Sequence, residues 1–151
     1  YNMDQCQWNG RGPVENYSDR KLSQNVGIYK SSADKLFFPY VRPQETGTMS
    51  DLRWWNQTDG GGFGFRVESD KMFSASALHY DLLSLDEGEE KHQRHSQSVE
   101  KSKYTNLFID LLQQGVGGVN SWDADGRARK GHRVEYKDYT FKFRLSPKTV
   151  Y

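Results

Sequence analysis

The most regular pattern in the sequence is YTFKFRL at residues 139–145, in which apolar and polar side chains alternate over the whole stretch. Successive side chains of a β-strand point to opposite faces, so this alternation predicts a half-buried strand. Residues 63–68 alternate in the same way, and residues 25–29 and 51–56 are rich in the aromatic and β-branched types that favour strands. A mostly apolar run at residues 105–112 predicts a further, central strand.

Stretches rich in glycine and proline separate these predicted strands. The first is WNGRGP at residues 8–13, which we expect to form a turn, and further clusters follow at residues 58–62 and 115–118. The charged stretch at residues 82–104 is expected to be a loop with at most a turn or two of helix. Short strands joined in this way predict an all-β fold, an antiparallel β-sandwich, in a single or partial domain covering residues 1–151.

Composition excludes several classes of protein. The chain has 21 Lys and Arg against 20 Asp and Glu, and this net charge of +1 lacks the basic excess that favours nucleic-acid binding. No apolar run approaches the roughly 20 residues that span a bilayer, so no membrane partner is expected. The 4 Trp, 9 Tyr and 8 Phe residues predict an aromatic-rich core.

Neither the N-terminal residues nor the cysteine content indicates the cellular compartment of the protein. Cys6 is the single cysteine, which excludes an internal disulfide but leaves both cytoplasm and periplasm open. The chain starts with Tyr1 and shows no signal peptide, so we expect a piece cut from a longer protein whose targeting signals are not visible.

Few residue patterns point to a metal or to a catalytic pair. His92 and His95 stand three residues apart but have no third ligand at useful spacing, so both are expected to be surface histidines. DADG at residues 123–126 resembles the start of a calcium loop, but Arg127 stands where that loop needs Asp or Asn. GVGG at residues 115–118 lacks the Lys-Ser/Thr of a phosphate-binding loop, and a tight turn is expected. No carboxylate pair can be chosen from spacing alone.

Trp122 is the residue that best fits a binding role. It follows the glycine-rich turn and has small polar neighbours, which indicates a loop position. An indole on a loop either covers the core or offers an exposed flat surface on which the C–H face of a sugar can pack. Residue chemistry alone leaves both interpretations open and favours structural packing.

Four motifs occur in order along nearly the whole chain. They are WNGRGPVENYSDR at residues 8–20, PYVRPQETG at 39–47 with DLRW at 51–54, FSASALHY at 73–80 and GVGGVNSW at 115–122. Together they resemble the C-terminal, small-chain and mutarotase-like domain of the β-galactosidases of glycoside hydrolase family 2.

This resemblance implies part of a galactose-mutarotase-like super-sandwich. It implies a parent enzyme that hydrolyses terminal β-D-galactosides such as lactose with retention, by means of two glutamates on a separate (β/α)₈ barrel. The present segment then contains no catalytic residue and is inactive alone. Its expected partners are a β-galactoside, the remaining domains of the parent chain and further copies of the parent. The family commonly uses magnesium and sodium, and no cofactor is expected in this segment.

The resemblance also implies a substrate-binding role for the loop. The matching tryptophan of the family contacts the sugar, chiefly on the leaving-group side, and this places Trp122 at the sugar with Asn120 and Asp123 beside it. Two positions depart from the family pattern: Val119 stands where an acidic residue is common, and Asp123 stands where a small residue often follows the tryptophan. The fine specificity for the leaving group is therefore not implied.

Two alternative functions stay open. One is a stand-alone carbohydrate-binding module without hydrolytic activity. The other is a mutarotase, which needs a general acid and a general base among residues such as His79, His132 and the glutamates. Fold similarity by itself does not establish that second activity.

The early motifs are interpreted as structural. Gly10, Gly12 and Pro13 are expected to set a turn. Charge-assisted pairs that tie loops to the sheets are expected between Asp19 and Arg20 or between Glu45 and Arg53.

Overall fold

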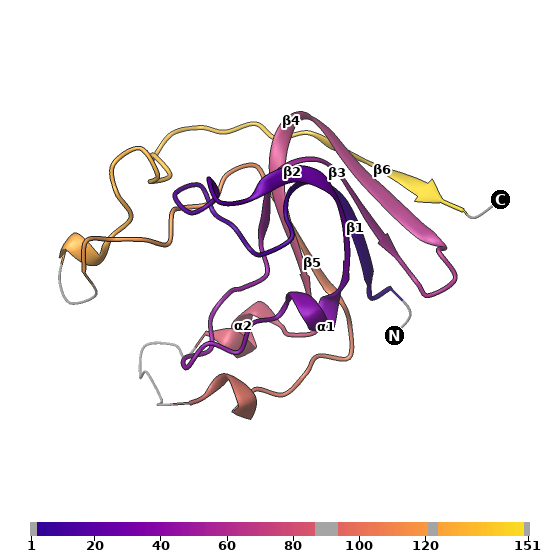
Figure 1. Cartoon of the computed structure of the whole chain (residues 1–151), viewed down its shortest axis with the longest axis horizontal. Helices are drawn as coiled ribbons and strands as arrows, with labels where there is room; N and C mark the ends of the chain where they lie inside the picture. Colours follow the sequence, from indigo (N-terminus) through magenta and orange to yellow (C-terminus); the bar gives the residue numbers. More distant parts are fainter. Residues whose placement is uncertain (1–2, 87–93, 121–123, 150–151) are drawn as a thin grey trace.

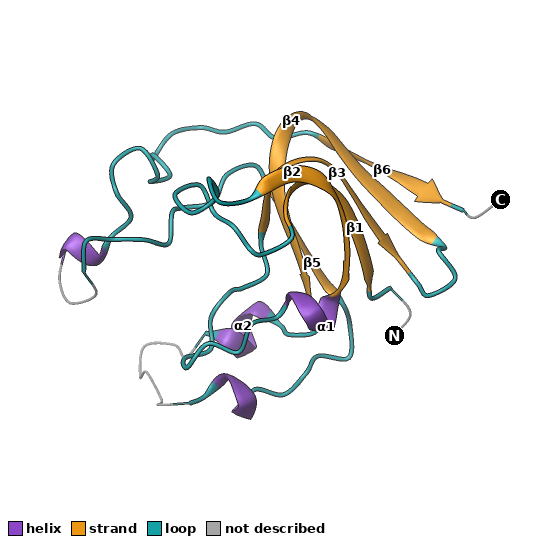
Figure 2. Cartoon of the chain, viewed as in Figure 1, coloured by secondary structure: helices purple, strands orange, loops and turns teal. Residues whose placement is uncertain are grey.

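The computed structural model describes residues 3–86, 94–120 and 124–149, which form a curved antiparallel sheet surrounded by short helices and long loops (Figures 1 and 2). In chain order its elements are β1 (Gln5–Gly12), β2 (Asn25–Ser32), α1 (Ala33–Leu36), β3 (Met49–Thr58), β4 (Gly64–Leu78), α2 (Leu82–Leu85), a 3₁₀ turn (Ser96–Ser98), β5 (Asn106–Asp110), a second 3₁₀ turn (Ala124–Gly126) and β6 (Phe143–Lys148). The strand order is β2-β1-β3-β4-β5, and β6 pairs with β4. The all-β antiparallel prediction is confirmed, and the sheet is consistent with a β-sandwich domain.

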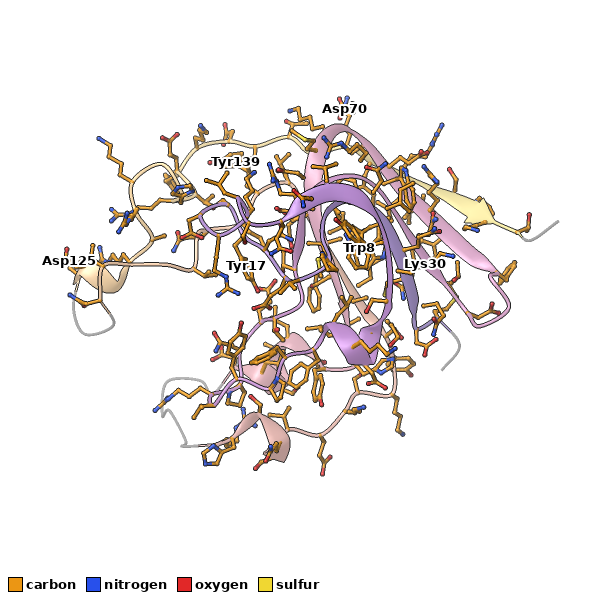
Figure 3. The ribbon with its side chains drawn as sticks, in the orientation of Figure 1. Trp8, Tyr17, Lys30, Asp70, Asp125 and Tyr139 are labelled. Atoms are coloured by element: carbon orange, nitrogen blue, oxygen red, sulfur yellow. The ribbon has the colours of Figure 1, made fainter. Side chains whose placement is uncertain are left out.

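A row of aromatic side chains crosses the sheet at the centre of the core. Trp8 of β1 lies opposite Tyr29 of β2 on one side and Trp55 of β3 on the other. The rings of Trp8 and Trp55 stack with centroids 5.5 Å apart. Trp8 lies inside the curve of the sheet (Figure 3). Their indole N–H groups donate to the carbonyl of Arg11 and to the side chain of Gln57, so both buried donors are paired. The predicted aromatic-rich core is confirmed.

Two short helices close one end of this core. Both α1 and α2 lie below the arch of the sheet in Figure 1. Leu36 of α1 and Leu85 of α2 are buried, and beside them the rings of Phe37 and Tyr80 stack with centroids 4.1 Å apart. Among the described helices none has the length and apolar character needed to cross a membrane. The charged stretch predicted as a loop contains α2 and one 3₁₀ turn in its described part, as expected.

The prediction of a turn at residues 8–13 is wrong, because β1 continues through Gly12. Both Gly10 and Gly12 lie on the buried face of the strand. A Cβ on Gly10 would lie 2.5 Å from the Leu52 side chain, and a Cβ on Gly12 would lie 2.8 Å from the Tyr29 ring. The glycines therefore make room for large side chains of the neighbouring strands, and their missing side chains hide the apolar alternation in the sequence.

The other predicted strands form, with two differences in extent and one in place. β5, predicted as a central strand, stands at the end of the strand order, where it pairs with β4. β4 runs far beyond the predicted residues 63–68, because its second half pairs with β5 as well as with β3. β6 begins at Phe143 and not at Tyr139, because its pairing with β4 stops where Phe143 meets Ser69. Pro147 is accommodated within β6, which is an edge strand where a missing N–H group is tolerated.

Candidate functional site

The loop after β5 projects away from the sheet. It carries the three residues predicted to bind substrate, and Asp125 lies near its tip, far from the core (Figures 1 and 3). Trp122 and Asp123 lie outside the described residues, so their predicted sugar contacts stay predictions. Asn120 is described and exposed on the loop. The described residues 115–119, which lead into this part of the chain, are called the loop stem below.

Two backbone hydrogen bonds hold the loop stem against the returning chain. The N–H of Gly115 donates to the carbonyl of His132 over 2.7 Å, and the N–H of Val119 donates to the carbonyl of Asp125 over 2.8 Å. The second bond joins described residues on either side of the predicted sugar-binding residues. Val119 and Asp125, which flank the predicted sugar-binding residues, are therefore held next to each other.

The side chain of Asp19 binds the loop stem from a distant part of the sequence. Its Oδ1 accepts from the N–H of Val116 over 3.2 Å, and its Oδ2 accepts from the N–H of Gly117 over 2.8 Å. Successive backbone N–H groups form a concavity suited to an anion. The tight turn expected at residues 115–118 does not form, and amides of this stretch bind a carboxylate of the same chain.

Two glycines of the loop stem are required by this close packing. A Cβ on Gly115 would collide with a carboxylate oxygen of Asp19 and would lie 2.8 Å from the Cβ of His132. A Cβ on Gly118 would lie 2.6 Å from the carbonyl oxygens of Asp125 and Gly126. Real Cβ atoms do not approach other atoms so closely, so a side chain at either position would displace the loop.

The turn that presents Asp19 is anchored on β3. Tyr17 and Arg20 exchange backbone hydrogen bonds around Asp19, and the preceding Asn16 is fully buried. The backbone N–H of Asn16 donates to the carbonyl of Thr48 over 2.8 Å, and its side-chain Oδ1 accepts from the N–H of Ser50 over 3.2 Å. Asp19 is thus held at a defined position relative to the sheet.

Glu15 ties the same segment to the loop between α1 and β3. Its carboxylate accepts hydrogen bonds from Arg20, Thr46 and the backbone N–H of Gly47 over 2.8, 2.8 and 2.9 Å, and a further one from the hydroxyl of Tyr40. Burial opposes the charge, but the hydrogen bonds from Tyr40, Gly47 and Thr46 and the nearby Arg20 hold the pKa of Glu15 below its usual value.

The expected pairs of Asp19 with Arg20 and of Glu45 with Arg53 are wrong, because these side chains bind other partners. Asp19 binds backbone amides, whereas Arg20 pairs with Glu15. Arg53 donates to the carbonyl of Asp51, and Glu45 accepts from the side chains of Gln113 and Thr48. The carboxylate of Asp51 also pairs with Arg11 and Lys21 over 2.6 and 2.7 Å.

Two partly buried carboxyl groups meet at the end of β5, just before the loop stem. The Nε2 of Gln113 donates to Glu45 over 2.7 Å and to Asp110 over 3.2 Å. Burial raises the pKa of both Glu45 and Asp110, and the nearby charge of Asp110 raises that of Glu45 further. Sequence reasoning missed this pair because its members are far apart along the chain and no local motif marks them.

His79, a candidate for mutarotase chemistry, is held on both sides of its ring. Its Nδ1 lies 3.0 Å from Asp34 Oδ1, and its Nε2 lies 3.1 Å from Thr105 Oγ1. Asp34 also binds Lys101 over 2.6 Å. His132 lies elsewhere, beside the loop stem, where its backbone carbonyl is the acceptor. The structure therefore does not bring the two histidines together as an acid and a base.

Two hollows of the surface lie away from the projecting loop. One, of about 500 Å³, lies between β4 and β6, and the other, of about 460 Å³, surrounds His79. The described loop residues line neither of them. Within residues 3–86, 94–120 and 124–149 no three His, Cys, Asp or Glu side chains are grouped to hold a metal ion. His95 is exposed, and His92 lies outside the described residues.

A family model described as "Beta galactosidase small chain" matches residues 1–145. The chain belongs to this β-galactosidase small-chain family. The small chain is 33% identical over 145 residues to a β-galactosidase of Priestia megaterium, 36% over 116 residues to the β-galactosidase BgaC of Bifidobacterium adolescentis, and 37% over 115 residues to a β-galactosidase of Vibrio cholerae.

These matches cover most of the small chain but little of each relative. They span 96%, 75% and 76% of this chain, and 13%, 10% and 10% of the respective relatives. The resemblance carried by the four sequence motifs is therefore confirmed at the level of the family, for a segment much shorter than the proteins it matches.

Proposed function

We propose that this small chain is the C-terminal β-sandwich segment of a retaining β-galactosidase that hydrolyses terminal β-D-galactosides such as lactose. The cleaving carboxyl groups belong to a separate catalytic barrel of the parent. The proposal is supported by the family match and by relatives that are named β-galactosidases. This chain spans only 10–13% of the first relatives, which leaves ample length for that barrel.

The segment's own contribution is to sugar binding at the mouth of the barrel pocket. The observation that carries this role is the projecting loop, whose stem is fixed by Asp19 and by two backbone hydrogen bonds. In the proposal Trp122 offers its flat indole to the C–H face of the sugar, while Asn120 and Asp123 pair with hydroxyl groups. Aromatic contacts of this kind contribute about 0.5–1.5 kcal/mol beyond buried area, which changes affinity several-fold.

The remaining expectations concern the parent and not this segment. In the proposal the magnesium and sodium ions implied by the family belong to the parent's other domains. Assembly into a homo-oligomer is likewise a property of the parent.

The test is the substitution Trp122→Ala in the full-length parent. Loss of the indole removes substrate binding but leaves the cleaving groups in place, so we expect KM for lactose to rise by about two- to tenfold with a smaller loss in kcat. Steady-state kinetics measure both quantities. Trp54→Ala is the matched control, because Trp54 lies on β3 with its ring against Arg66 and away from the loop. An unchanged KM in Trp122→Ala would remove this residue from the site.

A further inference from the structure

Asp19 is the point at which the projecting loop is fixed to the body of the molecule. The hydrogen bonds from Gly115 to His132 and from Val119 to Asp125 join the loop to residues that follow it closely in the sequence. The hydrogen bonds to Asp19 instead join it to the turn between β1 and β2. That turn is anchored on β3 through the buried side chain of Asn16.

The contact between Asp19 and the loop stem fixes the orientation of the stem as well as its attachment to the turn. Each carboxylate oxygen of Asp19 accepts from a different backbone N–H, and the two donors are adjacent in the chain. A carboxylate that uses both oxygens in this way fixes the direction of the peptide units as well as their distance. Gly115 lies so close to this carboxylate that a Cβ there would collide with it, so the contact requires a residue without a side chain at this position.

We propose that Asp19 is a positioning residue for galactoside binding: its carboxylate sets the loop stem so that the sugar-contacting residues that follow reach the substrate. This inference rests on the proposed function of the loop. Asp19 touches no substrate and takes no part in bond cleavage. Its effect on the enzyme passes through the residues after the stem, and Trp122 is the principal one.

The test uses Asp19→Asn in the full-length parent. The amide keeps one acceptor oxygen but turns an NH₂ group toward a backbone N–H, so one of the two hydrogen bonds is lost and two donors face each other. We expect KM for lactose to rise by about two- to tenfold, and by no more than in Trp122→Ala, with a smaller change in kcat.

Asp59→Asn is a control for the same replacement of an amide-binding carboxylate, at a site away from the loop. Asp59 Oδ1 accepts from the backbone N–H groups of Gly61 and Phe63 over 2.8 and 2.9 Å, in the glycine-rich turn between β3 and β4. That turn lies on the opposite side of the molecule from the projecting loop (Figure 1). Asp59→Asn keeps the one oxygen that accepts from both N–H groups, so its thermal midpoint is expected to fall less than that of Asp19→Asn. KM is expected to change in Asp19→Asn alone.

A double variant tests whether Asp19 acts through the loop. If it does, Asp19→Asn adds no further rise in KM when Trp122→Ala is already present, because coupled residues are not additive. Independent, multiplying effects overturn the inference, and so does an unchanged KM in Asp19→Asn while Trp122→Ala raises it. An unchanged KM in Trp122→Ala instead refutes the proposed function itself. Should Asp19→Asn fail to fold, Asp19→Ser, which also retains an oxygen acceptor, takes its place in the same comparison.

Discussion

At the scale of single residues, Glu15 shows how one carboxylate joins separate loops. Its partners come from the turn before β2 and from the segment between α1 and β3, and its side chain is 8% exposed. Arg20 supplies opposite charge, and Thr46 and Gly47 supply oriented donors. The ionised form is therefore favoured in the folded state although burial opposes it.

This network predicts a pH-dependent loss of stability in Glu15→Gln. The pKa of Glu15 is lower in the folded state than in the unfolded chain, so its ionisation stabilises the fold above about pH 4.3, the unfolded value, and this contribution is lost as pH falls through the lower folded-state pKa. We expect Glu15→Gln to lower the free energy of unfolding by about 1–3 kcal/mol at pH 7 and to approach the unsubstituted protein in acid. Urea unfolding of the parent at several pH values measures this difference.

Glu135→Gln serves as the control for that measurement. Glu135 also has a pKa lowered by an ion pair, here with Lys137, but its side chain is largely exposed. Surface pairs contribute little to stability. A loss in Glu135→Gln equal to that in Glu15→Gln, or a pH-independent loss in Glu15→Gln, would contradict the role given to the Glu15 network.

At the scale of elements, β3 carries two adjacent tryptophans with different environments. Trp55 is fully buried in the stack with Trp8, whereas Trp54 is partly exposed and lies with its ring centroid 4.3 Å from the guanidinium carbon of Arg66. Leu52 is also fully buried, although strict alternation from Leu52 would turn Trp54 and not Trp55 toward the core. Irregular pairing between Leu52 and Trp54 changes the phase of the strand.

The two tryptophans therefore predict unequal effects of the same substitution. Trp55→Ala leaves a large cavity in the core and is expected to cost about 3–5 kcal/mol of stability. Trp54→Ala loses mainly the contact with Arg66 and is expected to cost on the order of 1 kcal/mol. Urea unfolding of the parent measures the free energy of unfolding of both variants. Equal losses would contradict the assignment of Trp55 to the buried face of β3 and of Trp54 to the other face.

At the scale of the whole molecule, the sheet contains the hydrophobic core, and the projecting loop carries the residues predicted to bind sugar. The aromatic core fixes the sheet, and the sheet carries the turn that binds the loop stem. The two hollows described above lie away from this loop.

This division predicts that the isolated chain neither cleaves nor firmly binds galactosides. We expect no release of nitrophenol from a nitrophenyl β-galactoside, and calorimetric titration with lactose is expected to show no binding at millimolar concentrations. Circular dichroism checks that the preparation is folded. Millimolar or tighter binding that Trp122→Ala abolishes would instead support the stand-alone carbohydrate-binding module.

The sequence by itself determined the strand-forming segments other than β1, the aromatic core and the family. Period-two alternation and side-chain type are local properties, and the four motifs are contiguous, so each can be recognised without coordinates. Only the tertiary structure decided that Gly10 and Gly12 lie within a strand, which face Trp55 occupies, and that Asp19 binds the loop stem. Every residue except proline offers the same backbone N–H, so no sequence pattern states which two of them a distant carboxylate will meet.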